Sequence, residues 1–217
     1  MTPSTTPERF VCTTAKAVEG TLVFTDLVGF TEFTAGHGDA DALQLLAMQD
    51  RLARSVLSAP ARIVKELGDG LFLWFPHPAA ALRTALALHH RFEAEFSATR
   101  RGLSMRIGMN HGRALQRGAD LVGHDVNVAA RIAGAAAPGQ VLVSDTVRAG
   151  TDPPSAHVCF EELGPVVMKG MPVPIRLWRA SDGGQHELAA GPTELGMPGT
   201  GRAPRPCGLQ TGVLEAG

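Results

Sequence analysis

Two aspartates stand where carboxylates could bind a metal ion. Asp26 closes a short run of strand-forming residues at 21–25, and Asp69 lies in the turn between two strand-like runs. If those strands are neighbours, both carboxylates meet at one edge of a sheet. Mg²⁺ prefers oxygen ligands and leaves several positions to water and phosphate, so a pair of carboxylates suits it. The simpler alternative is that Asp69 is only a turn residue and Asp26 only a helix N-cap.

A second candidate pair is Asn127 and Arg131, which stand four residues apart in an alanine-rich stretch expected to form a helix over 123–137. That spacing places both side chains on one helix face. A solvated face is ordinary for arginine, but asparagine lowers helix propensity. Asparagine at this position therefore favours a function for the pair.

The elements that must position these residues follow from hydrophobic spacing and from turn residues. Strands are expected at 21–25, 62–67, 71–75, 103–109, 140–144, 158–163 and 173–179, and helices at 42–57, 78–96 and 123–137. The Gly-Asp-Gly turn at 68–70 predicts a tight hairpin. This order predicts an α+β sandwich, with helices on one face of a mostly antiparallel sheet.

The chain of 217 residues is long enough for one ordinary domain. We expect a flexible N-terminus at 1–17, one folded domain at 18–180 and a disordered tail at 181–217. The tail holds nine glycines and four prolines in 37 residues and no aromatic residue. Such a composition buries too little apolar surface to offset the entropy of ordering.

Charge and cysteine content exclude several classes of protein. A net charge of −1 offers no basic surface for nucleic acid or for an anionic membrane. The cysteines, Cys12, Cys159 and Cys207, are widely separated and match neither a disulfide framework nor a zinc site. No signal peptide or membrane span is recognisable. We therefore expect a cytoplasmic protein with no nucleic-acid or membrane partner.

Five short motifs in order resemble the catalytic domain of class III nucleotidyl cyclases. They are FTDLVGFT at 24–31, KELGDG at 65–70, RIGMNHGR at 106–113, DLVGHDVNVAAR at 120–131 and MKG at 168–170. Each motif is weak alone, but chance agreement of all five is improbable. The resemblance covers about 20–179 and implies a ferredoxin-like α/β sandwich. It further implies a homodimer that forms two active sites across its interface and converts a nucleoside triphosphate to a 3′,5′-cyclic monophosphate and pyrophosphate.

The resemblance also implies roles for the two candidate pairs. Asp26 and Asp69 match aspartates that hold two Mg²⁺ or Mn²⁺ ions, which activate the ribose 3′-hydroxyl and bind the triphosphate. Asn127 matches a residue that orients the ribose. Arg131 matches one that stabilises charge on the α-phosphoryl group.

Two further cations match triphosphate-binding positions, Arg113 and Lys169. Both residue types suit multiply charged oxygens, although a solvated surface charge is the ordinary reading of either one. In the family's dimers the metal aspartates and the arginine matched by Arg113 act from one subunit, and the other groups act from its partner. A monomer should then be inactive.

Lys65 and Asp120 match the positions that select the base. Lysine only donates hydrogen bonds, which suits adenine N1, and aspartate only accepts them, which suits the adenine 6-amino group. Guanine presents the opposite pattern, so the pair favours ATP. A plain ion pair between the two side chains is the alternative, and it is compatible with base selection.

The chain departs from the family pattern in a few places. Only six residues separate Arg113 from Asp120, as in a bacterial subgroup with a shortened dimerisation arm. His111 replaces a small hydroxyl residue, and His124 lies near the expected site; each is a surface histidine or a pH-sensitive contact. No regulatory domain is recognisable, so we expect control through metal, substrate level, expression or a separate partner.

The leading hypothesis is an adenylate cyclase, and two alternatives remain. One is a cyclase for GTP or a pyrimidine triphosphate, and the other is a nucleotide-binding regulatory domain without turnover. The hairpin lacks the Gly-Gly-Asp/Glu-Glu-Phe signature of diguanylate cyclases.

Overall fold

The computed structural model describes residues 15–97, 102–151 and 158–183. Most of the predicted flexible N-terminus and nearly all of the predicted tail lie outside these residues. None of the helices in the described part of the chain is long and apolar enough to cross a membrane.

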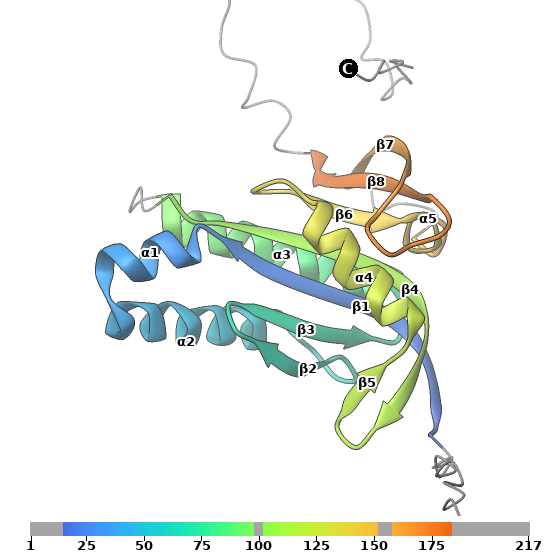
Figure 1. Ribbon diagram of the computed structural model, residues 1–217, viewed down its shortest axis with the longest axis horizontal. Coiled ribbons are helices and arrows are strands. Elements are labelled where there is room, and N and C mark those ends of the chain that lie inside the picture. The colour runs from blue at the N-terminus through green and yellow to red at the C-terminus, as the bar shows by residue number, and fades with distance from the viewer. Residues whose placement is uncertain (1–14, 98–101, 152–157, 184–217) are drawn as a thin grey trace, which may run out of the picture.

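One mostly antiparallel sheet forms the centre of the molecule (Figure 1). Its strands are β1 (Ala17–Val28), β2 (Arg62–Leu67), β3 (Gly70–Phe75), β4 (Ser104–Arg117), β5 (Asp120–Val122), β6 (Val141–Ser144), β7 (Val158–Val166) and β8 (Ile175–Asp182). They lie in the order β2-β3-β1-β4-β6-β8-β7, and β5 pairs with β4. The described pairings are antiparallel except for that of β4 with β6. The predicted mixture of helices and sheet is confirmed.

Helices cover both faces of this sheet, so the expectation of helices on one face is wrong. The helices are α1 (Phe30–His37), α2 (Asp39–Val56), α3 (Pro78–Ser97), α4 (His124–Ala135) and α5 (Asp145–Ala149). Alternate residues of β1 face opposite layers: Val23 packs with α2 and α3, whereas Leu22 and Phe24 pack with α4. A strand with two apolar faces needs a cover on each side. Figure 1 shows α4 in front of the sheet and α3 behind it.

Close backbone packing fixes the positions of α4 and of the β2–β3 hairpin. A Cβ atom on Gly108 of β4 would overlap the backbone of Ala133 in α4, so only glycine lets the helix lie this close. A Cβ on Gly70 would likewise overlap the carbonyl oxygen of Thr25. The Leu71 amide of β3 donates a hydrogen bond to Thr25 Oγ1 at 3.0 Å. The hairpin tip, with Asp69, is thereby held against the end of β1.

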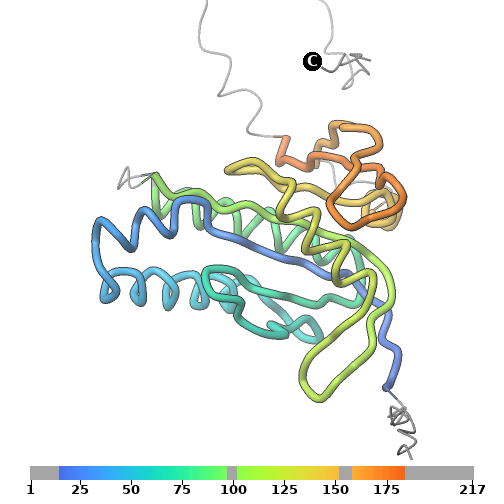
Figure 2. Tube along the Cα trace, viewed as in Figure 1, coloured from blue at the N-terminus to red at the C-terminus, as the bar shows by residue number. Residues whose placement is uncertain are grey.

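The long β1–β4 pair extends beyond the hydrophobic runs that predicted it. Its register runs from Ala17 opposite Leu115 to Val28 opposite Ser104. Figure 2 shows the β4–β5 hairpin extending past the neighbouring strands, alongside the beginning of β1. This projection carries Asp120 at the start of β5.

Candidate active site

Asp26 lies on β1 directly opposite Arg106 of β4. The guanidinium donates from Nε to Asp26 Oδ2 at 2.6 Å, and Nη2 lies 2.5 Å from the same oxygen. Both side chains are partly buried. Such a charge-assisted fork is stronger than a neutral hydrogen bond.

Asp69 is close enough to Asp26 for the two charges to interact. Burial raises the pKa of the Asp69 carboxyl above its usual range, and the negative charge of Asp26 raises it further. The Arg106 charge acts in the opposite direction. The structure thus brings together the two aspartates that sequence analysis paired.

The donor set at this edge of the sheet fits a hard divalent cation. Within the described part of the chain, no cluster of three or more His, Cys, Asp or Glu side chains could enclose a metal. Two carboxylates leave coordination positions to water and to substrate oxygens, which is how Mg²⁺ is usually bound. The repulsion between Asp26 and Asp69 is also the kind that a cation relieves.

Arg106 is a charged residue of this site that sequence analysis left without a role. It opens the RIGMNHGR motif, but its partner Asp26 lies 80 positions away, and only the strand register brings them together. The available sequence signal for this residue was an arginine within the strand predicted at 103–109. That this strand pairs with the strand of Asp26 was not predicted.

The structure does not place Arg113 beside the aspartates. Arg113 stands seven residues beyond Arg106 on β4, so along an extended strand it is about 23 Å from the register position of Asp26. Its backbone amide donates to Asp125 Oδ2 at 2.7 Å, and its side chain is exposed. Within one chain, Arg113 therefore belongs to the other end of α4.

Lys65 and Asp120 meet across two different strands. Lys65 Nζ of β2 donates to Asp120 Oδ2 of β5 at 2.6 Å, and the Leu121 amide donates to Asp120 Oδ1 at 2.8 Å. The hydrogen bond from Lys65 is the main cause that lowers the pKa of the Asp120 carboxyl. The two charged groups are only partly buried, so the polar groups of a ligand can reach them. The ion pair between these two side chains, which sequence analysis gave as the alternative to base selection, is therefore present.

Asn127 and Arg131 lie on the exposed side of α4, as their spacing predicts. Val126, Ala129 and Ala133 face the sheet on the opposite side of the helix. None of the hydrogen bonds or ion pairs formed among residues 15–97, 102–151 and 158–183 involves the side chain of Asn127 or Arg131.

Asn127 is separated from the aspartates along the helix axis. Arg106 Nη1 lies 3.4 Å from the carbonyl oxygens of Gly134 and Ala136, so Asp26 faces the C-terminal end of α4. Asn127 precedes Gly134 by seven residues, or about 10 Å of helix. One chain therefore keeps these two groups apart.

Lys169 lies between β7 and β8 with an exposed side chain. The preceding Met168 is buried against Val128 and Ile132 of α4. This packing of Met168 holds the segment that carries Lys169 against the helix that carries Asn127 and Arg131, although the two are distant in sequence.

His111 and His124, the two histidines noted in the sequence, lie near Arg113 and the N-terminal end of α4. His111 Nδ1 is 3.0 Å from Thr21 Oγ1, and its Nε2 is 3.7 Å from Glu19 Oε1. His124 is exposed at the first residue of α4.

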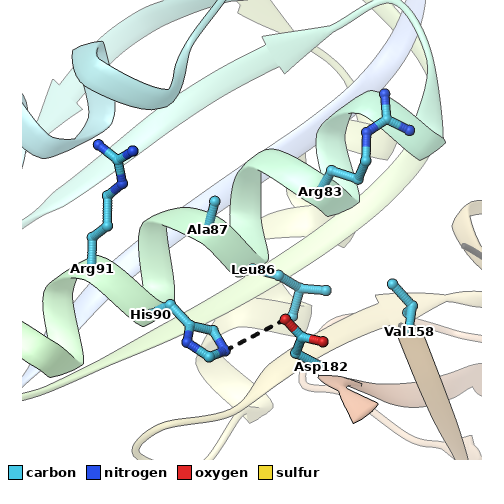
Figure 3. Close-up of a pocket in the computed structure, with 7 residues that line it drawn as sticks. All are labelled: Arg83, Leu86, Ala87, His90, Arg91, Val158 and Asp182. Carbon is cyan, nitrogen blue, oxygen red and sulfur yellow. Dashed lines mark ion pairs between the residues drawn. The ribbon is translucent and has the colours of Figure 1, made fainter. Parts of the chain in front are cut away.

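A pocket of about 370 Å³ lies away from all these groups, between α3 and the β7–β8 pair (Figure 3). Arg83, His90 and Arg91 of α3 line it together with Asp182 of β8, and His90 Nε2 lies 3.9 Å from Asp182 Oδ2. It is on the face opposite α4, so it is separate from the candidate site.

Comparison with known proteins matches the chain to cyclases. Residues 13–180 match the model of the adenylate and guanylate cyclase catalytic domain. A Mycobacterium tuberculosis protein named as a pH-sensitive adenylate cyclase is 33% identical over 173 residues, covering 79% of this chain but only 43% of that protein.

Solved structures agree with this match. A structure titled adenylate/guanylate cyclase/hydrolase from Silicibacter pomeroyi is 28% identical and has a TM-score of 0.67, covering 77% of this chain and 98% of that one. The adenylyl cyclase CyaB from P. aeruginosa shares the fold at 19% identity and a TM-score of 0.66, covering 77% and 96% of the two chains. With the fold, the motif order and most of the chain in agreement, the protein belongs to the class III adenylate and guanylate cyclase catalytic domain family.

Proposed function

We propose that this chain is an adenylate cyclase domain that converts ATP to 3′,5′-cyclic AMP and pyrophosphate as a homodimer. The family includes enzymes for both purines, so the choice of base must come from this chain's own side chains. The observation that carries the proposal is the Lys65–Asp120 pair, whose charges are 2.6 Å apart and partly exposed.

The pair favours adenine because of its fixed donor and acceptor pattern. Lys65 donates toward the unprotonated adenine N1, and Asp120 accepts from the 6-amino group. Guanine would direct its N1–H at the ammonium and its O6 at the carboxylate, which leaves two mismatched polar contacts. Because each side chain holds the other in place, little further ordering is needed when the base binds.

Asp26 and Asp69 are the residues that would hold Mg²⁺ or Mn²⁺. The bound ions would supply two effects, a lower pKa for the ribose 3′-hydroxyl and positive charge against the phosphates. In-line attack then forms a bond from the 3′-oxygen to the α-phosphorus and breaks the bond to pyrophosphate, while the hydroxyl proton is lost to water. Asn127 orients the ribose during this step, and Arg131 compensates the charge that develops on the α-phosphoryl group.

The triphosphate requires further cations. Lys169 and Arg113 are the two that the family motifs suggest. Arg106 is better placed than Arg113 within one chain, because its guanidinium already lies beside the metal aspartates.

The proposed homodimer is supported by the separation of groups within one chain. Asn127 is about 10 Å along α4 from the end that faces Asp26, so each site would combine the aspartates of one subunit with α4 of the other. Leu115 and Val122 form an exposed apolar pair on neighbouring positions of β4 and β5. A surface of this kind suits a protein interface.

The test is to incubate the purified protein with ATP, GTP, CTP or UTP, each with Mg²⁺ or Mn²⁺, and to identify products by mass spectrometry. We expect cyclic AMP from ATP and none from an Asp69→Ala variant with intact secondary structure. Cyclic GMP in its place would overturn the base assignment, and no product at all would favour a binding-only domain.

A further inference from the structure

We propose that Arg106 competes with the divalent metal for Asp26, so that it occupies this carboxylate in the metal-free protein and is displaced when metal binds. The inference rests on the proposed metal role of Asp26 and Asp69. It concerns a different property, namely the metal affinity of the protein without nucleotide.

The first argument is the contact itself. Two nitrogens of Arg106 converge on one oxygen, Asp26 Oδ2, at 2.6 Å and 2.5 Å. A metal ion that takes this oxygen must replace the fork, because one carboxylate oxygen does not accept a close cation and a guanidinium fork along the same directions. Part of the metal's binding free energy is therefore spent on breaking the ion pair.

The second argument is that Arg106 has a place to stay. Its Nη1 lies 3.4 Å from the carbonyl oxygens of Gly134 and Ala136 at the C-terminal end of α4. Helix C-terminal carbonyls attract positive charge. The guanidinium can therefore turn away from Asp26 without losing all its partners.

The third argument concerns the sign of the effect. Arg106 offsets the repulsion between Asp26 and Asp69, and its charge would oppose an incoming cation. Removing that charge should make the metal-free site less stable and the metal-bound site more favourable. A residue that only supports the fold would have the opposite effect, because damage to the site weakens metal binding.

The experiment measures Mn²⁺ binding without nucleotide, using the electron paramagnetic resonance signal of the free ion in a titration. We expect Arg106→Gln to lower the Kd for Mn²⁺ about tenfold relative to the unmodified protein. Arg106→Lys keeps the charge but cannot form the fork, so its Kd should lie between the two and provides a test if the glutamine variant does not fold.

Two controls make the result specific. Arg54→Gln removes an arginine from another arginine–aspartate pair, Arg54 with Asp50 on α2, and should leave the Kd unchanged. In an Asp26→Asn background, the Arg106→Gln substitution should tighten binding much less, because the competition for Asp26 is gone and only the general repulsion between Arg106 and the cation remains.

An unchanged or higher Kd in Arg106→Gln would overturn the proposal, as would tightening that is equally large without the Asp26 carboxylate. Cyclic AMP formation by the unmodified protein is measured separately. A failed metal result therefore leaves the proposed reaction standing, and a failed product assay leaves the competition testable.

Discussion

The charged pairs on the strands of the sheet and the outer face of α4 differ in how far one chain organises them. On the sheet, Asp26 is bonded to Arg106 and Lys65 to Asp120, each pair at 2.6 Å or closer. On α4, no hydrogen bond or ion pair formed among the described residues holds the side chain of Asn127 or Arg131, and both residues are exposed. One chain therefore organises the pairs on the sheet, which we call the sheet half of the site. Under the proposed function, the nucleotide and a second subunit would organise the residues on α4, which we call the helix half.

The sheet half should show the largest effect on activity. Asp69→Asn keeps the shape of the side chain but removes a charge that the proposed metal needs, so we expect kcat for cyclic AMP to fall by at least about a thousandfold. Thermal unfolding should show no loss of stability, since the substitution also removes the repulsion from Asp26. Substantial turnover by a folded Asp69→Asn protein would break the distinction between the two halves.

The helix half should affect rate without affecting the fold. Asn127→Ala and Arg131→Ala should each lower kcat about a hundredfold with a smaller change in KM, as expected for contacts made mainly in the transition state. Because both side chains are exposed, unfolding free energies should change by no more than about 0.5 kcal/mol. Steady-state kinetics and urea denaturation measure the two quantities, and a large loss of stability would mean that α4 depends on these side chains after all.

Exchange of the Lys65–Asp120 pair sharpens the account of the sheet half. In the double variant Lys65→Glu with Asp120→Lys the ion pair is kept, but the donor and acceptor positions are reversed, so the pair should now suit guanine. We expect the ratio of kcat/KM for ATP over GTP to fall at least about tenfold. An unchanged ratio would show that the pair is only structural.

The smallest effect concerns the same pair and pH. The hydrogen bond from Lys65 lowers the pKa of Asp120 in the folded protein, so its stabilisation is present above the ordinary aspartate range and is lost as pH falls through the lowered pKa. Asp120→Asn should thus cost at most about 1 kcal/mol near neutral pH, since the pair is partly exposed. Urea denaturation of both proteins at several pH values should show this difference shrinking in acid, and a difference that grows in acid would contradict the assignment.

Sequence reasoning succeeded where the pattern is local. The hairpin around Asp69 and the helix with Asn127 and Arg131 follow from turn residues and 3.6-residue spacing, and the structure has them at nearly the predicted bounds. The sequence analysis did not predict α1, α5 or β5, which are short elements. In α1 a single residue, Phe33, is buried, so periodicity has little to detect.

Non-local contacts account for the other differences. The pairing of Arg106 with Asp26 depends on the register of two strands far apart in sequence, as does the length of β1 and β4. The second helix layer depends on both faces of the central strands being buried. A run of apolar residues predicts a strand, but it does not show whether both faces of that strand are buried unless the neighbouring elements are known.

The most direct test of the account is to mix two impaired chains. Asp26→Ala and Asn127→Ala proteins, each folded and each strongly impaired in turnover alone, are combined and assayed for cyclic AMP. Shared sites predict recovered activity, because a mixed dimer contains one site with both the metal aspartates and an intact α4. A mixture that exchanges subunits yet shows no more activity than the separate variants together would contradict the division of the site between two chains.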